Sequence, residues 1–258
     1  KCGYSVQMKH AVLFGCNYAN DRAAQLRGCI NDVLNVEGYL KEIGFDRVDV
    51  FTDEKSPNDT TAVGIMSHIN ELAVRSWRET LDIVWIHFSG HGCQVKDWNG
   101  DEKDGMDECI VPSNYKKAGI IRDDNLSRAL CGFHPSTRII AVFDCCHSGT
   151  ILDLPHRYLS KTTKSTEATT NIPEAHVVLI SGCRDDQTSA DAFNVANRMK
   201  FTGAMTSCLL QTLKETPTDL FDLQSKLHVK LRAKNFTQVP QICSSFELKD
   251  DCGIFWEA

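Results

Sequence analysis

The sequence predicts an α/β fold, in which a mainly parallel central sheet carries helices on both faces. Four runs of four consecutive apolar residues have the length and composition of fully buried strands, at residues 11–14, 83–86, 139–142 and 177–180. Segments with apolar residues at helical spacing lie between most of these runs, and this alternation is typical of parallel sheets. The 258 residues, 42% of them hydrophobic, suffice for one large domain with a full core.

The first half of the chain alternates strands with helices. Strands are expected at residues 9–16, 48–52 and 82–88. Helices are expected at residues 26–43 and 60–77, and Gly44 supplies the C-terminal cap of the first. A polar loop rich in Asp and Gly follows from Gly90 to Asp107. A short strand at 109–111 and a helix at 123–130 complete this half.

The second half repeats the alternation after a polar interruption. Strands are expected at 138–143, 176–181 and 242–246, and helices at 202–214 and 219–234. Residues 160–170 are dense in Ser, Thr and Lys without periodicity, which predicts a mobile surface loop. We therefore expect a single domain over residues 1–258, with a large subregion at about 1–159, a mobile loop at about 160–175 and a small subregion at about 176–258.

Composition excludes several classes of function. The net charge of −6 argues against non-specific nucleic-acid binding, which usually requires a basic surface. No apolar run approaches the roughly 18 residues of a membrane-spanning helix. The first residues do not resemble a signal peptide, and the chain lacks an initiating Met. We expect an intracellular protein, in the cytoplasm or on the cytoplasmic face of vesicles.

The 12 cysteines allow two interpretations, disulfides in a secreted protein or buried thiols in a reducing compartment. Several of them, such as Cys16 and Cys208, lie in apolar runs where a small hydrophobic residue would serve, which favours thiols. No Cys-x-x-Cys pair occurs, so a structural zinc site is poorly supported. A redox or zinc protein using Cys145, Cys146 and His147 is one alternative function.

Reactive residues follow two of the apolar runs directly. His91 stands between two glycines after the strand at 82–88, and Cys146 follows the strand at 138–143. Ligands of open α/β sheets bind beyond the carboxyl ends of the strands, so both side chains are expected at one edge. A thiolate there can attack a carbonyl while the imidazole carries the proton, and the backbone N–H groups of Gly92 and Cys146 can stabilise the oxyanion. The alternative is a buried His and a buried Cys with no joint role.

The runs Ser89-Gly90-His91-Gly92 and Asp144-Cys145-Cys146-His147-Ser148-Gly149 resemble the two signature motifs of metacaspases. The resemblance extends from about Lys9 to Phe246. It implies a caspase-like fold, also called the caspase–hemoglobinase fold. It also implies a cysteine endopeptidase with Cys146 as nucleophile and His91 as acid/base partner, and a structural role for Cys145.

The resemblance further implies cleavage of protein or peptide substrates after Arg or Lys. A basic side chain requires a carboxylate-lined pocket. Asp32 and Asp144 match the acidic positions of the metacaspase pocket, and Cys29 and Ser89 match positions that line it. On residue type alone, Asp32 is a solvated carboxylate on a helix.

The acidic run from Asp97 to Glu108 suggests a metal site but fails the EF-hand template, because Glu102 replaces the Gly of position six. The resemblance implies a calcium site elsewhere, built from Asp107, Asp123, Asp124 and Asp153. Clustered carboxylates repel one another unless a cation such as Ca²⁺ binds them. We expect calcium to order the segment that carries the nucleophile.

The short segment between the two halves resembles the short-linker, type I metacaspases, which are monomers. The strand at 242–246 is expected at the sheet edge, where the charged residues that follow it would discourage pairing. Lys200, and less specifically Lys161 and Lys164, are possible sites of self-cleavage. The second alternative function is a catalytically silent relative that acts as a calcium-binding or scaffold protein.

Overall fold

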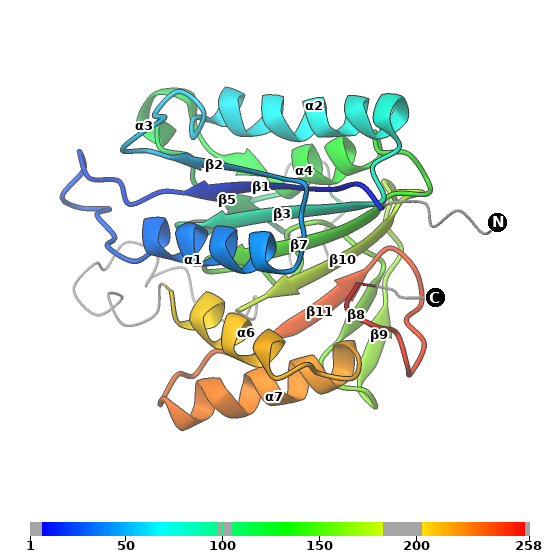
Figure 1. The fold of residues 1–258 in the computed structure, drawn as a ribbon. Helices are drawn as coiled ribbons and strands as arrows, with labels where there is room; N and C mark the ends of the chain where they lie inside the picture. The colour runs from blue at the N-terminus through cyan, green and yellow to red at the C-terminus, as the bar shows by residue number, and fades with distance from the viewer. Residues whose placement is uncertain (1–6, 98–99, 101–104, 183–202, 256–258) are drawn as a thin grey trace.

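An eight-stranded sheet forms the centre of the molecule (Figure 1). The computed structural model describes residues 7–97, 100, 105–182 and 203–255. The sheet has the order β2-β1-β3-β7-β10-β11-β8-β9. Its strands are β1 (Lys9–Gly15), β2 (Arg47–Thr52), β3 (Ile83–Ser89), β7 (Arg138–Asp144), β8 (His156–Tyr158), β9 (Lys164–Thr166), β10 (His176–Ser181) and β11 (Gln241–Ser244). The five strands from β2 to β10 are parallel, and the remaining pairings are antiparallel. The expected mainly parallel sheet is confirmed.

Helices cover both faces of this sheet (Figure 1). One face carries α2 (Ala62–Glu79) and α4 (Asp123–Leu130), and the other carries α1 (Cys29–Glu42), α6 (Ala204–Lys214) and α7 (Leu220–Ala233). Successive side chains of β3 point to opposite faces of the sheet and contribute to both cores. Val84 and Ile86 pack with the α2 side, whereas Ile83 and Trp85 pack with the α1 side. Because both faces are buried, the central strands read as unbroken apolar runs.

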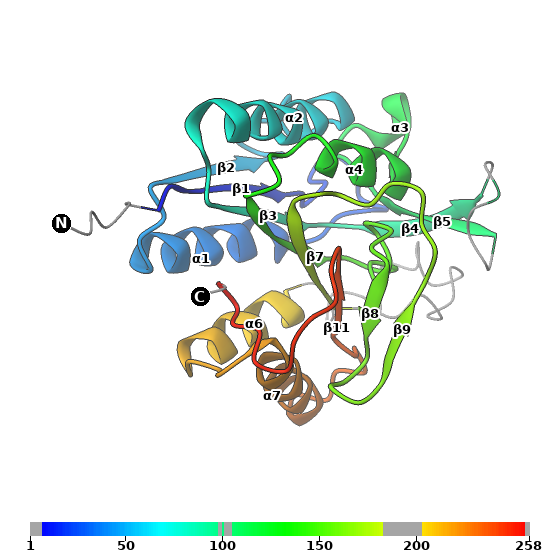
Figure 2. The same ribbon diagram turned by 90° about the vertical axis from the view of Figure 1, so that its right-hand side faces the viewer.

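A second, antiparallel sheet projects from the end of β3 (Figure 2). It consists of β4 (Gly92–Lys96), β5 (Met106–Ile110) and β6 (Ile121–Arg122), and the short helix α3 (Tyr115–Ala118) lies between β5 and β6. The expectation of a loop from Gly90 to Asp107 was therefore wrong for Gly92–Lys96 and for Met106 and Asp107, which belong to β4 and β5. The short strand Gly92–Lys96 has only one strongly apolar residue, Val95, so no period was visible.

The expected edge strand is an interior strand. β11 pairs with β10 on one side and with β8 on the other, so β9 is the strand at that edge. The segment 160–175, expected as a loop, contains β9, whose three residues are exposed. Because β11 is an interior strand, the charged residues that follow it do not protect a sheet edge. The monomeric state, which the resemblance to short-linker metacaspases implies, stays a prediction.

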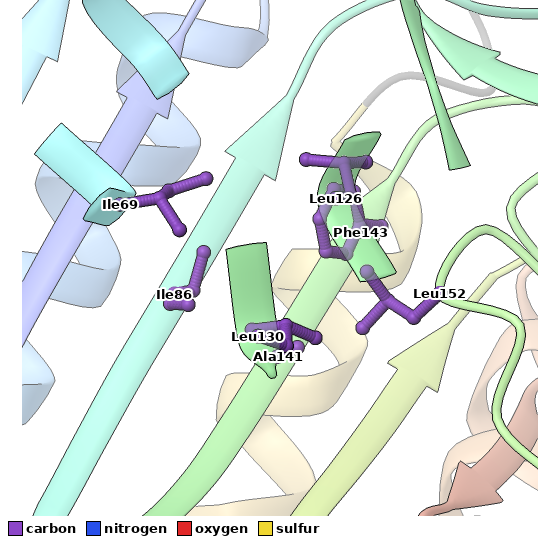
Figure 3. A pocket seen from close by; sticks show the side chains of 7 residues that line it. All are labelled: Ile69, Ile86, Leu126, Leu130, Ala141, Phe143 and Leu152. Carbon is purple, nitrogen blue, oxygen red and sulfur yellow. The ribbon is translucent and has the colours of Figure 1, made fainter. Parts of the chain in front are cut away.

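The core between the sheet and helices α2 and α4 is tightly filled near β3 and β7. A gap of about 10 Å³ lies between α2, α4, β3 and β7, and only apolar side chains line it (Figure 3). Leu152, from the segment after β7, points into this gap beside Phe143 and Leu126. The gap has room for at most one water molecule, so packing fixes the segment that follows Cys146.

Among the helices of the described part, none is long and apolar enough to cross a membrane.

Candidate active site

The register of β3 and β7 brings His91 and Cys146 to the same edge of the sheet. Ser89 pairs with Asp144 at the last step of this parallel ladder, and each reactive residue comes two positions later. The chains then touch: a Cβ atom placed on Gly92 would lie 1.9 Å from the carbonyl oxygen of Cys146. Only glycine permits this approach. The structure therefore brings together the two residues that the sequence predicted as a catalytic pair.

Two contacts hold the imidazole of His91. Its Nε2 donates to the carbonyl oxygen of Ala24 at 2.7 Å, so the neutral ring carries its proton on Nε2 and leaves Nδ1 as the acceptor. The Tyr18 ring lies 4.9 Å from the imidazole, between ring centroids. The Tyr18 hydroxyl accepts from the His91 backbone N–H at 2.9 Å and donates to the Val111 carbonyl at 2.6 Å. The buried tyrosine thus ties the backbone of His91 to the end of β5.

The two adjacent cysteines differ in access to solvent. Cys146 is half-buried, whereas Cys145 is 5% exposed. Burial raises the pKa of the Cys145 thiol well above its usual value, and the nearby Cys146 and Asp144 raise it further. His147 follows in the left-handed region at φ 51°, and the Ser148 hydroxyl donates to the carbonyl of Cys145 at 2.9 Å. This tight turn presents Cys146 and buries its neighbour.

A buried acidic cluster, at the place of the predicted pocket, lies on the α1 side of the same edge. The Ser89 hydroxyl donates to Asp32 Oδ2 at 3.0 Å. Burial raises the pKa of the Cys29 thiol well above its usual value, and Ser89 opposes this. Asp144 accepts from the backbone N–H and the hydroxyl of Thr206, at 2.9 Å and 2.7 Å. All four predicted residues, Cys29, Asp32, Ser89 and Asp144, are therefore neighbours, and each is at most 6% exposed. Asp32 is not the solvated helix carboxylate that its residue type suggested.

The two carboxylates raise each other's cost of ionisation. Burial, followed by the charge of Asp144, raises the pKa of Asp32 to about 7, and the hydrogen bond from Ser89 opposes this. Burial also raises the pKa of Asp144, against the two hydrogen bonds from Thr206. Two buried carboxylates without a cation hold a proton between them near neutral pH. The pocket is therefore suited to a buried positive charge.

The predicted calcium ligands lie on the small sheet and beyond the nucleophile. Asp123 Oδ2 accepts from the backbone N–H of Glu108, which places Asp123 beside Asp107. Arg122 forms an ion pair with the Asp107 carboxylate, so a cation would have to displace it. Asp124 follows in the first turn of α4, and Asp153 adopts a left-handed φ of 49°. Among the described residues, no three His, Cys, Asp or Glu side chains are arranged to hold a metal ion.

A buried carboxylate connects this region to the turn of the nucleophile. Glu108 is 1% exposed and accepts from the Gln94 amide and from the Thr150 hydroxyl, at 2.9 Å and 2.5 Å. Thr150 follows Cys146 by four residues, and its carbonyl accepts from the Asp153 backbone N–H at 2.7 Å. These hydrogen bonds join β5 directly to the segment that follows the nucleophile.

Comparison with known proteins agrees with this architecture. The family model described as "Caspase domain" matches residues 8–250. Metacaspase-1 of Sclerotinia sclerotiorum is 34% identical over 93% of this chain and 66% of its own length. Metacaspase-1A of Aspergillus niger is 33% identical over 93% of this chain and 71% of its own length. This chain is a metacaspase. The family is one of caspase-domain cysteine peptidases.

Other relatives are longer or more distant. Metacaspase-5 of Trypanosoma brucei brucei is 35% identical over 91% of this metacaspase chain, which covers 50% of that relative. The chain thus spans about half to two thirds of several curated relatives that it matches. A crystal structure of a protein from Geobacter sulfurreducens superposes with a TM-score of 0.66 at 23% identity, covering 96% of this chain and 98% of that one. That likeness supports the caspase-like fold.

Sequence reasoning missed several residues of the metacaspase site. Tyr18 and Ala24 lie in the loop after β1, and Thr206 lies in the first turn of α6, where no spacing or motif identified them. Gly203 approaches the pocket so closely that a Cβ there would lie 3.0 Å from Asp32 Oδ1. Of the predicted self-cleavage positions, Lys200 lies outside the described residues, and Lys161 and Lys164 form exposed ion pairs.

Proposed function

We propose that this metacaspase domain is a calcium-dependent cysteine endopeptidase that hydrolyses peptide bonds after Arg or Lys. The observation that carries this proposal is the pair of buried carboxylates, Asp32 and Asp144, at the same sheet edge as Cys146 and His91. A buried carboxylate pair without a cation is destabilising, and an Arg or Lys side chain of the substrate would supply the missing charge. An Asp or Glu side chain there would meet two like charges.

The catalytic step follows from the tautomer of His91. Nδ1 accepts the thiol proton of Cys146, and the thiolate attacks the carbonyl carbon of the scissile bond. His91 then gives the proton to the leaving amine, and an acyl-enzyme remains, which water hydrolyses with His91 again as base. The Ala24 carbonyl stabilises the imidazolium that forms between these steps, because it accepts a hydrogen bond from Nε2–H.

The antiparallel register supports Gly92 as an oxyanion donor. Val111 N–H donates to the His91 carbonyl, so His91 and Val111 form a hydrogen-bonded pair of this ladder. Gly92 and Ile110 are the next pair, and their backbone groups point away from each other. The Gly92 N–H is therefore directed away from β5, and Gly92 packs against the Cys146 backbone. Such a donor typically contributes about 100-fold or more in rate.

Asp107, Asp123, Asp124 and Asp153 are the proposed calcium ligands, and they would have to come closer together to bind it, since no three such side chains of the described residues already form a metal site. Carboxylate oxygens are the ligands that this cation prefers. Its positive charge would offset the repulsion between the negatively charged side chains. Arg122 is the competing cation for Asp107. The bridge from Glu108 to Thr150 supports an effect of this region on the nucleophile turn.

The test is hydrolysis of matched fluorogenic peptides that end in Arg or Asp, each with about 1 mM calcium or with a chelator. We expect cleavage of the Arg peptide only, and only with calcium, and Cys146→Ala should abolish it. Cleavage of the Arg peptide in the chelator would refute the calcium requirement alone. Cleavage of the Asp peptide would refute the pocket assignment, and cleavage of neither would favour a silent scaffold protein.

A further inference from the structure

Two thiols face each other across the small sheet, outside the catalytic pair. Cys93 on β4 and Cys109 on β5 are directly opposite in the antiparallel register. Cys109 is fully buried and Cys93 is 8% exposed. Both are thiols in the structure, and the Cys109 thiol donates to the Asp107 carbonyl oxygen at 3.7 Å. The proposed peptidase chemistry uses neither of them.

The backbone separation of this pair suits a disulfide. His91 accepts from Val111 N–H, and Asp97 N–H donates to Gly105, so every second pair of this ladder is hydrogen-bonded. Counting inward from either bond makes Cys93 and Cys109 a hydrogen-bonded pair. The Cα atoms of such a pair lie about 5.5 Å apart, which is close to the commonest spacing in disulfides. The Cβ atoms of a hydrogen-bonded pair also lie about 5.5 Å apart, so β4 and β5 must approach by about 1 Å for the S–S bond to form.

The two thiols differ in a way that assigns their roles. Cys93 is the more accessible of the two, at 8% exposed against 0% for Cys109, so an oxidant reaches it first. Cys109 lies behind it and is positioned as the resolving thiol.

We propose that Cys93 and Cys109 form an oxidation site, at which a hydroperoxide converts the two thiols into a disulfide between β4 and β5. The Cys93 thiolate attacks the hydroperoxide, an S–O bond forms as the O–O bond breaks, and an alcohol or water leaves. The Cys109 sulfur then attacks the sulfenic acid, and the S–S bond forms as water leaves with the thiol proton. The hydroperoxide takes up the two electrons that the sulfurs lose.

The disulfide would close a loop that begins next to the catalytic histidine and contains a predicted calcium ligand. The cysteines are 16 residues apart, and the loop between them contains the predicted calcium ligand Asp107. Cys93 follows His91 by two residues, so the bond would hold the strand next to the catalytic histidine. Closing a loop of this length restricts the unfolded chain and should raise the Tm by roughly 5 °C.

The experiment uses the whole chain, reduced and then exposed to hydrogen peroxide under native conditions. The remaining thiols are alkylated, and a non-reducing digest is analysed by mass spectrometry. We expect a peptide that links Cys93 to Cys109 and that dithiothreitol separates. The link should also form in Cys146→Ala, in which oxidised protein should melt at the higher temperature. The matched control is Cys131→Ser, which removes an exposed thiol away from this sheet and should leave the link intact.

Cys109→Ser provides the second arm. Without the resolving thiol, Cys93 should remain a sulfenic acid, which dimedone traps. The proposal is wrong if peroxide that fully oxidises Cys131 leaves no Cys93–Cys109 link, or if Cys93 is linked to Cys145 instead. Cys145 is the competing thiol, since its sulfur lies 3.1 Å from the position of a Cβ on Gly92. The wild-type measurement stands whether or not the variants fold.

Discussion

At the scale of single residues, the acidic pocket depends on a proton that the substrate must replace. Asp32 ionises near pH 7 because burial and Asp144 both oppose its charge. An Arg side chain binds the charged form, so binding releases a proton whenever Asp32 starts protonated. Below the pKa of Asp32, each unit of pH therefore costs about tenfold in the affinity of a cationic side chain.

We accordingly predict that KM for an Arg peptide rises about tenfold per pH unit as the pH falls below 7. Steady-state kinetics between pH 5 and about 8 measure this. The rate of Cys146 alkylation by iodoacetamide serves as the control that reports on Cys146 and His91 alone. Asp32→Asn should raise KM at pH 8 and flatten its pH dependence. A KM that is constant across this range would contradict the pocket assignment.

The residues of this pocket illustrate what the sequence could and could not predict. Cys29, Asp32, Ser89 and Asp144 were predicted because they lie next to motifs that resemble those of a known family. Thr206 was missed, although its two hydrogen bonds keep Asp144 in place, because a Thr in the first turn of a helix has no pattern of its own. Tyr18 was missed for a similar reason, since its contacts with His91 and Val111 span 73 and 93 positions.

At the scale of elements, the contact between β4 and the nucleophile turn determines the geometry of the active edge. Gly92 begins β4, and its backbone lies against the Cys146 carbonyl. This strand was expected as loop, because five residues with little apolar content show no alternation. Only the pairing with β5 makes it a strand, and that pairing depends on residues ten or more positions away.

Gly92→Ala should lower both activity and stability. Its Cβ would lie 1.9 Å from the Cys146 oxygen, so β4 must move away and take the Gly92 N–H with it. We expect kcat to fall about 100-fold or more and the Tm to fall by several degrees. Gly38→Ala is the matched control, because that glycine is exposed on α1 and a Cβ there meets nothing within 4 Å. Peptidase assays and thermal melting measure both effects, and an active Gly92→Ala would contradict the contact.

At the scale of the whole molecule, the two predicted subregions share one sheet. β7 and β10 belong to different subregions, and they pair in parallel over six residues. The segment expected as a loop between them adds β9 to the sheet through β8, and β8 pairs with β11. The sequence predicted the shared sheet from its apolar runs. It could not predict the strand order beyond β10, because the exposed residues of β9 carry no apolar period.

A break in this connecting segment should therefore leave the molecule intact. We propose inserting a site for a sequence-specific protease between Ala168 and Thr169, beyond β9, in a part of the chain that lies at the surface. After cleavage, the two fragments should co-elute in size-exclusion chromatography and separate only in denaturant, because the β7–β10 ladder and the cores on both faces remain buried. The uncut variant is the control for elution volume. Fragments that separate in native buffer would mean that the covalent connection, rather than the sheet, holds the halves together.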